Sequence, residues 1–325
     1  MKKIWLFYWW MWNESEISFI SALNIEKNID RKIYQLFPIF RDKNWNFFLC
    51  NRVEEKDTGT KINIEDFHNV FDIAFLITHG KYGEDGVLQA ILESQKIKYC
   101  GCGVLSSALC MDKWVFKLFC QGHDIPQVPF KILTDDESEN FKIVSKFLLK
   151  CNSTIYVKPA NSGSSIGISK VYSLEEFDQA YKEAKKYDDS IIVEKWLENH
   201  REIEVWILWN KKIIISDPWE LIVENSFYDF DNKYKNGKTK IEIPAKLSGE
   251  IVDKIKFYSE KVYRLCNCKG FARVDFFLIG DEIYINEINT LPWFTDISMF
   301  PLLMQNMWIS YTKLLSKIIE LADNI

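Results

Sequence analysis

Apolar runs and segments of helical spacing alternate along the first third of the chain. Residues 4–8 and 70–77 are short apolar runs, which are typical of strands that are buried on both faces. Residues 15–25 and 86–94 carry apolar side chains at helical spacing. Strands that alternate with helices predict a parallel sheet whose strands are joined by crossover helices. We therefore expect an α/β unit in this part of the chain.

The pattern changes beyond residue 105, where strands become more frequent. A long helix is predicted over residues 106–121, and Pro126 and Pro129 then mark an extended connection. A polar stretch over residues 225–240 predicts a mobile loop. The other predicted elements are strands at 154–159, 190–194, 202–209, 212–216, 272–279 and 282–288, and helices at 174–186 and within 299–322.

The composition is typical of a soluble protein with two or three compact domains. The chain has 325 residues, of which 47% are hydrophobic and 27% charged, and its net charge is −5. It has no basic patch or tail, so nucleic acid is not an expected partner. Its apolar runs are too short to span a membrane. The N-terminal segment lacks a small-residue cleavage site, so we read it as a strand of a cytoplasmic protein rather than a signal peptide.

The eight cysteines are scattered along the chain and do not have zinc-site spacing. Cys100 and Cys102 are separated by one residue, as are Cys266 and Cys268. Structural zinc sites usually pair cysteines that are two to four residues apart. We therefore expect reduced thiols and no metal–thiolate site.

A loop of small polar residues follows the predicted strand that ends at Lys158 and Pro159. Its residues are Asn-Ser-Gly-Ser-Ser-Ile-Gly over positions 161–167. Small residues let backbone N–H groups approach phosphate oxygens closely, and serine hydroxyls add further donors. Taken alone, such a loop is more often an ordinary hairpin turn. Lys158 and the acidic cluster near the C-terminus change the balance in favour of a phosphate site.

That acidic cluster consists of Asp275, Glu287 and Asn289, which lie in two predicted strands that can form a hairpin. Residues i and i+2 share a face, and paired strands place such groups side by side. Two carboxylates and an amide oxygen suit Mg²⁺. Arg273 shares the face of Asp275 and would contact an anion beside the metal. A solvated sheet face is the alternative, but the flanking residues are mostly apolar.

With these residues in place, the chain resembles the D-alanine–D-alanine ligases, which are ATP-grasp enzymes, over nearly its whole length. The matching segments are THGKYGEDGVLQAILE, GVLSSALCMDK, VKPANSGSSIGISKV, REIEV, FYDFDNKY, RVDFFL and NEINTLP-FT-ISMFP. The resemblance implies a Rossmann-like N-terminal α/β domain over residues 1–104. An α+β ATP-grasp fold with subdomains at 105–193 and 194–325 would follow and clasp ATP between them. It also implies a homodimer.

The resemblance further implies roles for individual residues. ATP would be bound by Lys113, Lys158, Ser164, Ser165, Glu194, Lys195, Trp196, Leu197, Glu202 and Lys233. Two Mg²⁺ ions, or Mn²⁺ in their place, would be bound by Asp275, Glu287 and Asn289. The substrates and the reacting groups would be held by Glu14, His79, Ser164, Tyr234, Arg273, Trp293 and Ser298.

Within this resemblance, two D-alanines are the expected substrates. Glu14 would bind the ammonium of the first, Ser298 the carboxylate of the second, and Arg273 with the N–H of residue 293 the oxyanion. Tyr234 favours D-alanine as second substrate, whereas ligases that use D-lactate tend to carry histidine there. Ligases that use D-lactate or D-serine remain alternatives, as does a non-catalytic ATP-binding homologue. Carboxylase-like and glutathione-synthesis-like ATP-grasp enzymes match the motifs poorly.

Glycine is scarce in this chain and tryptophan is abundant. The chain has 13 glycines, or 4.0%, where about 7% is usual, and 12 tryptophans, or 3.7%. The family places glycine at Trp9, Trp10, Trp209, Trp219 and Trp293, and glycine would fit at Trp5, Trp12, Trp45, Trp114, Trp206 and Trp308. Trp196 is different, since tryptophan occurs there in some relatives.

We hypothesise that these positions carry glycine, because the gene uses a code in which UGA means glycine. Trp293 follows a proline in a turn where a left-handed, glycine-type backbone is expected. Trp9 and Trp10 follow the first predicted strand, where the backbone would pass close to a substrate. The alternative is a divergent, aromatic-rich homologue, in which indoles beside the substrate would impair turnover.

Overall fold

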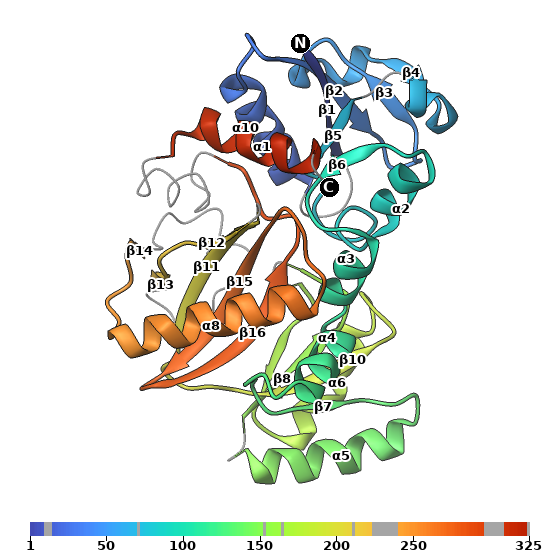
Figure 1. The fold of residues 1–325 in the computed structure, drawn as a ribbon. Coiled ribbons are helices and arrows are strands. Elements are labelled where there is room, and N and C mark those ends of the chain that lie inside the picture. The colour runs from blue at the N-terminus through green and yellow to red at the C-terminus, as the bar shows by residue number, and fades with distance from the viewer. Residues whose placement is uncertain are drawn as a thin grey trace.

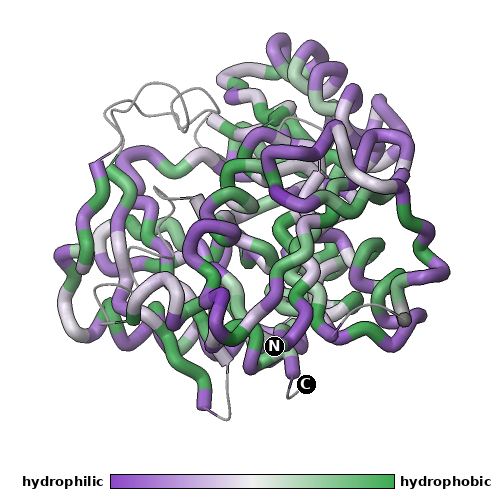
Figure 2. The backbone as a smooth tube through the Cα atoms, turned by 90° about the horizontal axis from the view of Figure 1, so that it is seen from above, coloured by the Kyte–Doolittle hydropathy of each residue, from purple (hydrophilic) through white to green (hydrophobic). Residues whose placement is uncertain are grey.

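The computed structural model describes residues 1–9, 15–69, 72–151, 154–163, 166–209, 212–222, 240–295 and 309–323. Within these ranges, three β-sheets follow one another along the chain, and helices pack against each (Figure 1). Hydrophobic and hydrophilic segments alternate along the backbone (Figure 2). Among the described helices, none has the length and apolar character needed to cross a membrane.

The first sheet combines a parallel core with an antiparallel edge. Its order is β4-β3-β2-β1-β5-β6. The strands are β1 (Lys2–Trp9), β2 (Tyr34–Arg41), β3 (Phe47–Leu49), β4 (Thr60–Ile62), β5 (Ile73–Leu76) and β6 (Lys98–Cys100). β2, β1, β5 and β6 pair in parallel, as expected for the predicted parallel sheet, but only β1 and β5 of these strands were predicted individually. β3 and β4 pair antiparallel and were not predicted, because three-residue strands carry too little periodicity.

Helices from both ends of the chain pack on the first sheet. They are α1 (Ser15–Asn28), α2 (Val87–Ser94), α10 (Tyr311–Asp323) and the 3₁₀ helices η1 (Val53–Thr58) and η2 (Ile64–Asn69). Leu314, Leu315 and Ile318 of α10 are buried in the same core as β1 and β5. Asp323, the last residue of α10, forms ion pairs with Lys2 and Lys98. The final described helix therefore completes the N-terminal unit.

The helix predicted over residues 106–121 is two helices, so that prediction was wrong in part. α3 (Val104–Met111) ends before Asp112, and α4 (Lys113–Gly122) begins after it. Asp112 has an extended backbone, with φ −83° and ψ 102°. Its side chain accepts a hydrogen bond of 3.0 Å from the N–H of Val115, which caps the second helix. The break places Lys113 at the first position of α4.

The second sheet is antiparallel and has the order β7-β10-β8-β9. Its strands are β7 (Phe130–Ile132), β10 (Ile191–Lys195), β8 (Ile155–Pro159) and β9 (Ser169–Val171), and its helices are α5 (Glu137–Lys150) and α6 (Leu174–Ala184). Val144 and Phe147 of α5 pack with Phe177 of α6 in the core above this sheet. Two of the strands, β8 and β10, carry Lys158 and Glu194 side by side.

The third sheet is a second antiparallel layer, with the order β14-β13-β11-β15-β16 and with β12 paired to β11. Its elements are β11 (Arg201–Trp209), β12 (Ile213–Ile215), β13 (Trp219–Ile222), β14 (Lys240–Glu242), α8 (Gly249–Leu265), β15 (Phe271–Ile279) and β16 (Glu282–Asn289). The strands predicted at 202–209, 212–216, 272–279 and 282–288 are confirmed. Helix α8 was not predicted. Its N-cap Ser248 accepts a hydrogen bond from Ile251.

Some predictions concern parts of the chain that the structure does not describe. Most of the predicted loop at 225–240 and residues 299–308 of the predicted C-terminal helices lie outside the described residues. The proposed domain boundaries fall at the start of α3 and within β10, and the division into three domains stays a prediction.

All eight cysteines are free and buried. This agrees with the thiols expected from the sequence. Among the residues that the structure describes, no three or more His, Cys, Asp or Glu side chains form a metal-binding group. The predicted Mg²⁺ ligands are Asp275, Glu287 and Asn289. Because Asn289 is an amide, these three residues do not count as a group of three His, Cys, Asp or Glu side chains.

Some of the described tryptophans differ in burial and in backbone conformation. Trp5, Trp9, Trp206 and Trp219 lie in strands and are the largest fully buried side chains. Trp5 stacks on Phe37 with ring centroids 5.5 Å apart. Trp45 instead has φ 63°, a left-handed conformation that favours glycine. The indole N–H groups of Trp9 and Trp219 are buried without a hydrogen-bond partner in the described structure, which costs about 1–3 kcal/mol each.

The left-handed backbone expected at Trp293 is not observed. Trp293 is not among the described residues with positive φ. The neighbouring backbone is held in another way, because the N–H of Phe294 donates to Ser21 Oγ at 3.2 Å and its carbonyl accepts from the Tyr311 hydroxyl at 2.7 Å. The identity of the residues at the tryptophan positions stays a hypothesis.

Candidate functional site

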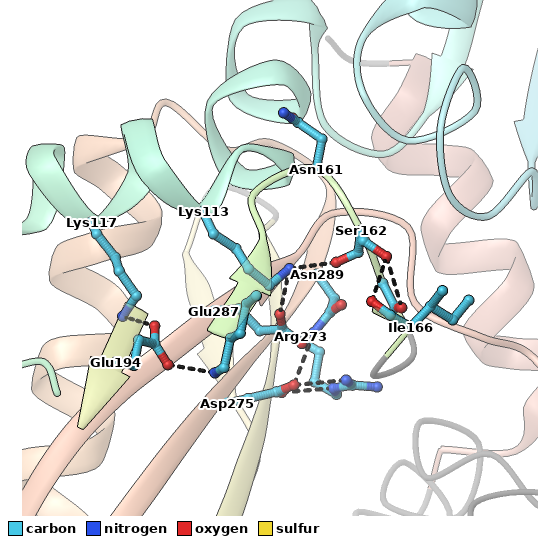
Figure 3. A network of polar contacts seen from close by, with 12 residues as sticks. Lys113, Lys117, Asn161, Ser162, Ile166, Glu194, Arg273, Asp275, Glu287 and Asn289 are labelled. Atoms are coloured by element: carbon cyan, nitrogen blue, oxygen red, sulfur yellow. Dashed lines mark hydrogen bonds and ion pairs between the residues drawn. The ribbon is translucent and has the colours of Figure 1, made fainter. Parts of the chain in front are cut away.

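The β15–β16 hairpin brings the predicted acidic residues together. Asp275 pairs with Glu287 across the two strands, and Arg273 pairs with Asn289. The amide of Asn289 donates a hydrogen bond of 2.9 Å to Asp275 Oδ2. These side chains lie on one face of the hairpin (Figure 3), as the two-residue spacing predicts.

Arg273 is held by two carboxylates. Its Nε and Nη2 donate to the two oxygens of Asp275, each at 2.7 Å, and Nε lies 2.8 Å from Glu204 Oε2. Burial lowers the pKa of Arg273, but Asp275 and Glu204 outweigh it, and the pKa is well above its usual value. The guanidinium is therefore permanently charged and fixed in direction.

A pocket opens over this hairpin and is rich in carboxylates. Its lining residues are Glu202, Ile203, Glu204, Arg273, Asp275, Phe276, Phe277, Asn286 and Glu287. Four of them are acidic and one is basic, so the lining has a formal charge of −3. Such an excess of partly buried negative charge is stabilised by a divalent cation. The donors present therefore fit Mg²⁺, which prefers carboxylate and amide oxygens.

Lys113 connects this hairpin to the predicted phosphate loop. Its Nζ lies 3.4 Å from Glu287 Oε2 and donates a hydrogen bond of 2.8 Å to the carbonyl of Ser162 (Figure 3). The backbone N–H of Lys113 also bonds to the carbonyl of Ala160 at 3.1 Å. The first turn of α4, the loop after β8 and the end of β16 therefore meet at one point.

The described part of the loop is held in place by local hydrogen bonds. The N–H of Asn161 donates to Asp188 Oδ2 at 2.7 Å, and its side-chain amide donates to the same oxygen at 3.0 Å. Gly167 has φ 73°, and a Cβ there would lie 2.6 Å from the ring of Tyr187. Only glycine fits this position without strain. Both ends of the loop, at Asn161 and Gly167, are therefore held in a defined conformation.

Lys158 lies under this loop and is buried, with 7% exposure. It forms an ion pair with Glu194 on the neighbouring strand β10. Glu194 also contacts Lys117, which the sequence analysis did not single out. Burial raises the pKa of Glu194, but Lys117 and Lys158 outweigh it and lower the pKa to about 2.

The predicted adenine side follows directly along β10. Lys195 ends this strand, and Trp196 and Leu197 are buried just beyond it. The Trp196 ring packs edge-on against Tyr156, with centroids 4.9 Å apart, and Lys170 lies over it at 4.3 Å. Glu202 follows on β11 and lines the carboxylate-rich pocket. Trp196 and Leu197 therefore lie on the connection from β10 of the second sheet to β11 of the third, which carries Glu202.

His79 and Trp293 are two further predicted site residues, which follow strand β5 of the first sheet and strand β16 of the third. Their rings are in edge contact, with centroids 6.1 Å apart. His79 is fully buried and its Nδ1 lies 2.9 Å from the carbonyl of Leu291. Burial lowers the pKa of His79 to about 3, although this hydrogen bond acts in the opposite direction. His79 is therefore neutral, with Nδ1 as the donor and Nε2 available as an acceptor.

Several predicted site residues lie outside the described residues. They are Glu14, Ser164, Ser165, Lys233, Tyr234 and Ser298. Two residues that the sequence analysis missed are Glu204 and Lys117. Glu204 could have been found, because it lies two residues from Glu202 on the same strand face. Lys117 follows Lys113 by one helical turn, but nothing in the sequence indicates that it is buried.

Comparisons with known proteins identify the family of this chain. Residues 12–102 match the family profile "D-ala D-ala ligase N-terminus", and residues 119–320 match "D-ala D-ala ligase C-terminus". The D-alanine–D-alanine ligase of Clostridium novyi is 37% identical over 336 residues, which cover 99% of this chain and 98% of that relative.

Solved structures of two ligases have the same fold. D-alanyl-alanine synthetase A from Vibrio cholerae is 27% identical with a TM-score of 0.88, and the alignment covers 99% of this chain and 98% of that one. The VanG D-Ala:D-Ser ligase from Enterococcus faecalis is 28% identical with a TM-score of 0.87, and 99% of each chain is covered. On these similarities, the chain belongs to the D-alanine–D-alanine ligase family.

Proposed function

We propose that this protein joins two D-alanine molecules into D-alanyl-D-alanine for peptidoglycan synthesis, with ATP as the energy source. The observation that carries the proposal is the position of Lys113, which contacts Glu287 of the acidic hairpin and Ser162 of the loop. A cation at this junction can hold the phosphates of a nucleotide over metal-binding oxygens. We place the reaction in the cytoplasm, where ATP is made, and infer a homodimer from the family.

The reaction proceeds in two steps. The γ-phosphoryl group of ATP is transferred to a carboxylate oxygen of the first D-alanine, which gives an acyl phosphate and ADP. The amine of the second D-alanine then attacks the acyl carbon. The amine loses a proton, and inorganic phosphate leaves as the peptide bond forms. Activation is needed because a free carboxylate is a poor electrophile.

Residues of this chain provide charge and position for these steps. Lys113 and Lys158 contact the phosphates, with Ser164 and Ser165 of the loop and Lys233. Arg273 and the N–H of Trp293 stabilise the oxyanion. Arg273 suits this role because Asp275 and Glu204 fix its direction. Neutral His79 accepts a hydrogen bond near the first substrate, whose ammonium is bound by Glu14.

Asp275, Glu287 and Asn289 would hold two Mg²⁺ ions, or Mn²⁺ in their place. When bound, these ions offset negative charge on the phosphate oxygens. Lys195, Trp196, Leu197, Glu194 and Glu202 would bind the adenosine part of ATP. A closing loop that carries Lys233 and Tyr234 would keep water from the acyl phosphate.

The choice of second substrate rests on Tyr234 and Ser298. A neutral tyrosine beside the incoming group favours an amine over the hydroxyl of D-lactate, and Ser298 would bind the carboxylate of the second D-alanine. The alternatives are ligation of D-alanine to D-lactate or to D-serine, and ATP binding without turnover.

The test measures phosphate release and dipeptide formation with ATP, Mg²⁺ and D-alanine. We expect one phosphate per dipeptide and loss of both products when the divalent ion is chelated. Parallel reactions replace the second D-alanine by D-lactate or D-serine. A higher kcat/KM with either would contradict the proposed substrate. ATP binding without phosphate release would contradict an enzymatic role.

A further inference from the structure

Lys117 is a buried cation to which the proposed reaction gives no role. It lies on α4, one helical turn after Lys113, and its side chain is 2% exposed. A lysine is almost never buried to this extent unless it is paired with an acid. Lys117 belongs to the same ion-pair group as Lys158, to which the proposed function gives a role in ATP binding.

The contacts of Lys117 fix its ammonium group against Glu194. Its Nζ lies 2.6 Å from Glu194 Oε1 (Figure 3). Lys158 pairs with Oε2 of the same carboxylate. The ammonium also lies over the ring of Phe130, 5.4 Å from its centroid. Phe130 is the residue that pairs with Glu194 between β7 and β10. One carboxylate is thus shared by two buried lysines.

The charges of this group leave one positive charge in excess. Glu194 is ionised, because its two lysines lower its pKa despite burial. One of the two lysines neutralises it, and the other remains as a net positive charge in a buried site. Lys158 is the one that lies beside the phosphate loop, since it ends the strand that leads into residues 161–167. Without Lys117, Lys158 would be needed to neutralise Glu194.

We propose that Lys117 is a positioning residue for the nucleotide: by neutralising Glu194 it leaves the charge of Lys158 free to act on the phosphates. This inference rests on the proposed function, since it takes a nucleotide as the ligand. Direct contact between Lys117 and ATP is not required for this role. Lys117 acts through Glu194 and Lys158, so its effect is on nucleotide binding more than on the chemical steps.

The first experiment measures binding of ADP by titration calorimetry and steady-state kinetics with ATP. Lys117→Met should weaken ADP binding by about tenfold or more, as expected for the loss of a buried charged interaction. KM for ATP should rise more than kcat falls. Lys117→Arg, which keeps the charge, should bind ADP within about threefold of the original protein. Lys146→Met removes an exposed lysine of α5 and should change nothing.

The second experiment tests whether Lys117 acts through Glu194. Glu194→Gln removes the charge that Lys117 neutralises, so Lys117→Met should have much less effect on ADP binding in that background. The double variant buries no unpaired carboxylate, so it can be studied even if Lys117→Met alone does not fold. In that case, ADP binding by the double variant as tight as by Glu194→Gln supports the proposal, and binding about tenfold weaker contradicts it. Equal effects of Lys117→Met in both backgrounds would overturn the proposal. So would unchanged ADP binding by folded Lys117→Met protein.

These outcomes are separate from failure of the proposed function. If the original protein binds ADP but forms no dipeptide, the ligase proposal fails while the role of Lys117 in nucleotide binding stands. If the original protein binds no ADP, both fail.

Discussion

The guanidinium of Arg273 and the carboxylate of Asp275 are joined by two hydrogen bonds of 2.7 Å, although the residues are only two positions apart on one strand. The pair holds a cationic and an anionic side chain together along one strand face. Each therefore fixes the direction of the other.

Asp275→Asn should strongly reduce ligation. The amide keeps the shape of the side chain but removes one of the negative charges that suit Mg²⁺, and it releases Arg273 from its bidentate contact. We expect kcat/KM to fall by roughly a hundredfold or more and the Mg²⁺ concentration for half-maximal activity to rise. The measurement is a magnesium titration of phosphate release. Asp281→Asn, at the exposed turn of the same hairpin, is the control, and an unchanged magnesium profile for Asp275→Asn would exclude a metal-binding role.

As the pH falls, protonation linked to His79 should destabilise the protein at a higher pH than protonation of the carboxylates does. In the unfolded chain a histidine takes up a proton near pH 6.5, whereas the folded His79 has a pKa of about 3. Below pH 6.5 the unfolded state therefore binds one more proton. The free energy of unfolding then falls by up to about 1.4 kcal/mol per pH unit. The contribution of His79 is complete above pH 6.5 and is lost as the pH falls towards 3.

Urea unfolding between pH 6.5 and 4.5 measures this slope, because Glu194, with a pKa of about 2, adds an effect of the same sign only at lower pH. His79→Gln should unfold with a shallower dependence on pH in this window. His123→Gln, which changes an exposed histidine, should keep the original slope. Equal slopes for all three proteins would show that burial of His79 does not govern acid stability.

Removing apolar contacts of the last helix should destabilise the first sheet. Leu315 is fully buried in the core shared by α10 and β1, so Leu315→Ala should lower the free energy of unfolding by about 2–5 kcal/mol. Leu149→Ala changes a leucine of α5 that is 80% exposed and should have an effect within about 0.5 kcal/mol. Urea unfolding followed by circular dichroism measures both. Similar stabilities for the two variants would contradict the packing of α10 on this sheet.

The tryptophan hypothesis is tested most directly on the protein made by its own cell. Peptide mass spectrometry should find glycine at position 45, where the backbone is left-handed, and at positions 9 and 219, where indole N–H groups lack partners in the described structure. The codons should read UGA. Tryptophan masses, or UGG at most of the twelve positions, would reject the hypothesis.

A matched pair of substitutions gives an independent measure of strain. Trp45→Gly relieves a left-handed tryptophan, so it should destabilise far less than Trp5→Gly, which removes a buried ring stacked on Phe37. Thermal unfolding of both variants makes the comparison. Equal losses would show that position 45 has no preference for glycine.

The part of the site that lies on regular strands could be predicted from the sequence. Asp275 and Glu287 belong to strands with clear patterns, and the two-residue period then places Arg273 and Asn289 on the same face. The contact of Lys117 with Glu194 could not be predicted. It depends on how α4 packs against the second sheet, and no local pattern encodes that packing.

Parts of the fold were missed for similar reasons. The break at Asp112 interrupts a continuous helical pattern, and its signal is a single capping residue that is also common within helices. Helix α8 follows a polar stretch, and its charged residues hide a narrow apolar stripe of Ile251, Ile255 and Val262. A narrow stripe is weak evidence for a helix without knowledge of the sheet that it covers.

The packing of α10 against β5 and β6 also determines when the first sheet can complete its core during synthesis. Strands β1, β2, β5 and β6 leave the ribosome early, but the apolar face that α10 covers stays open until the last described helix has been made. The N-terminal unit therefore cannot complete its core before α10 has been made, whereas the second sheet has all its strands and helices within residues 130–195. The second sheet can thus fold before the first sheet is complete, although it follows the first sheet in the sequence.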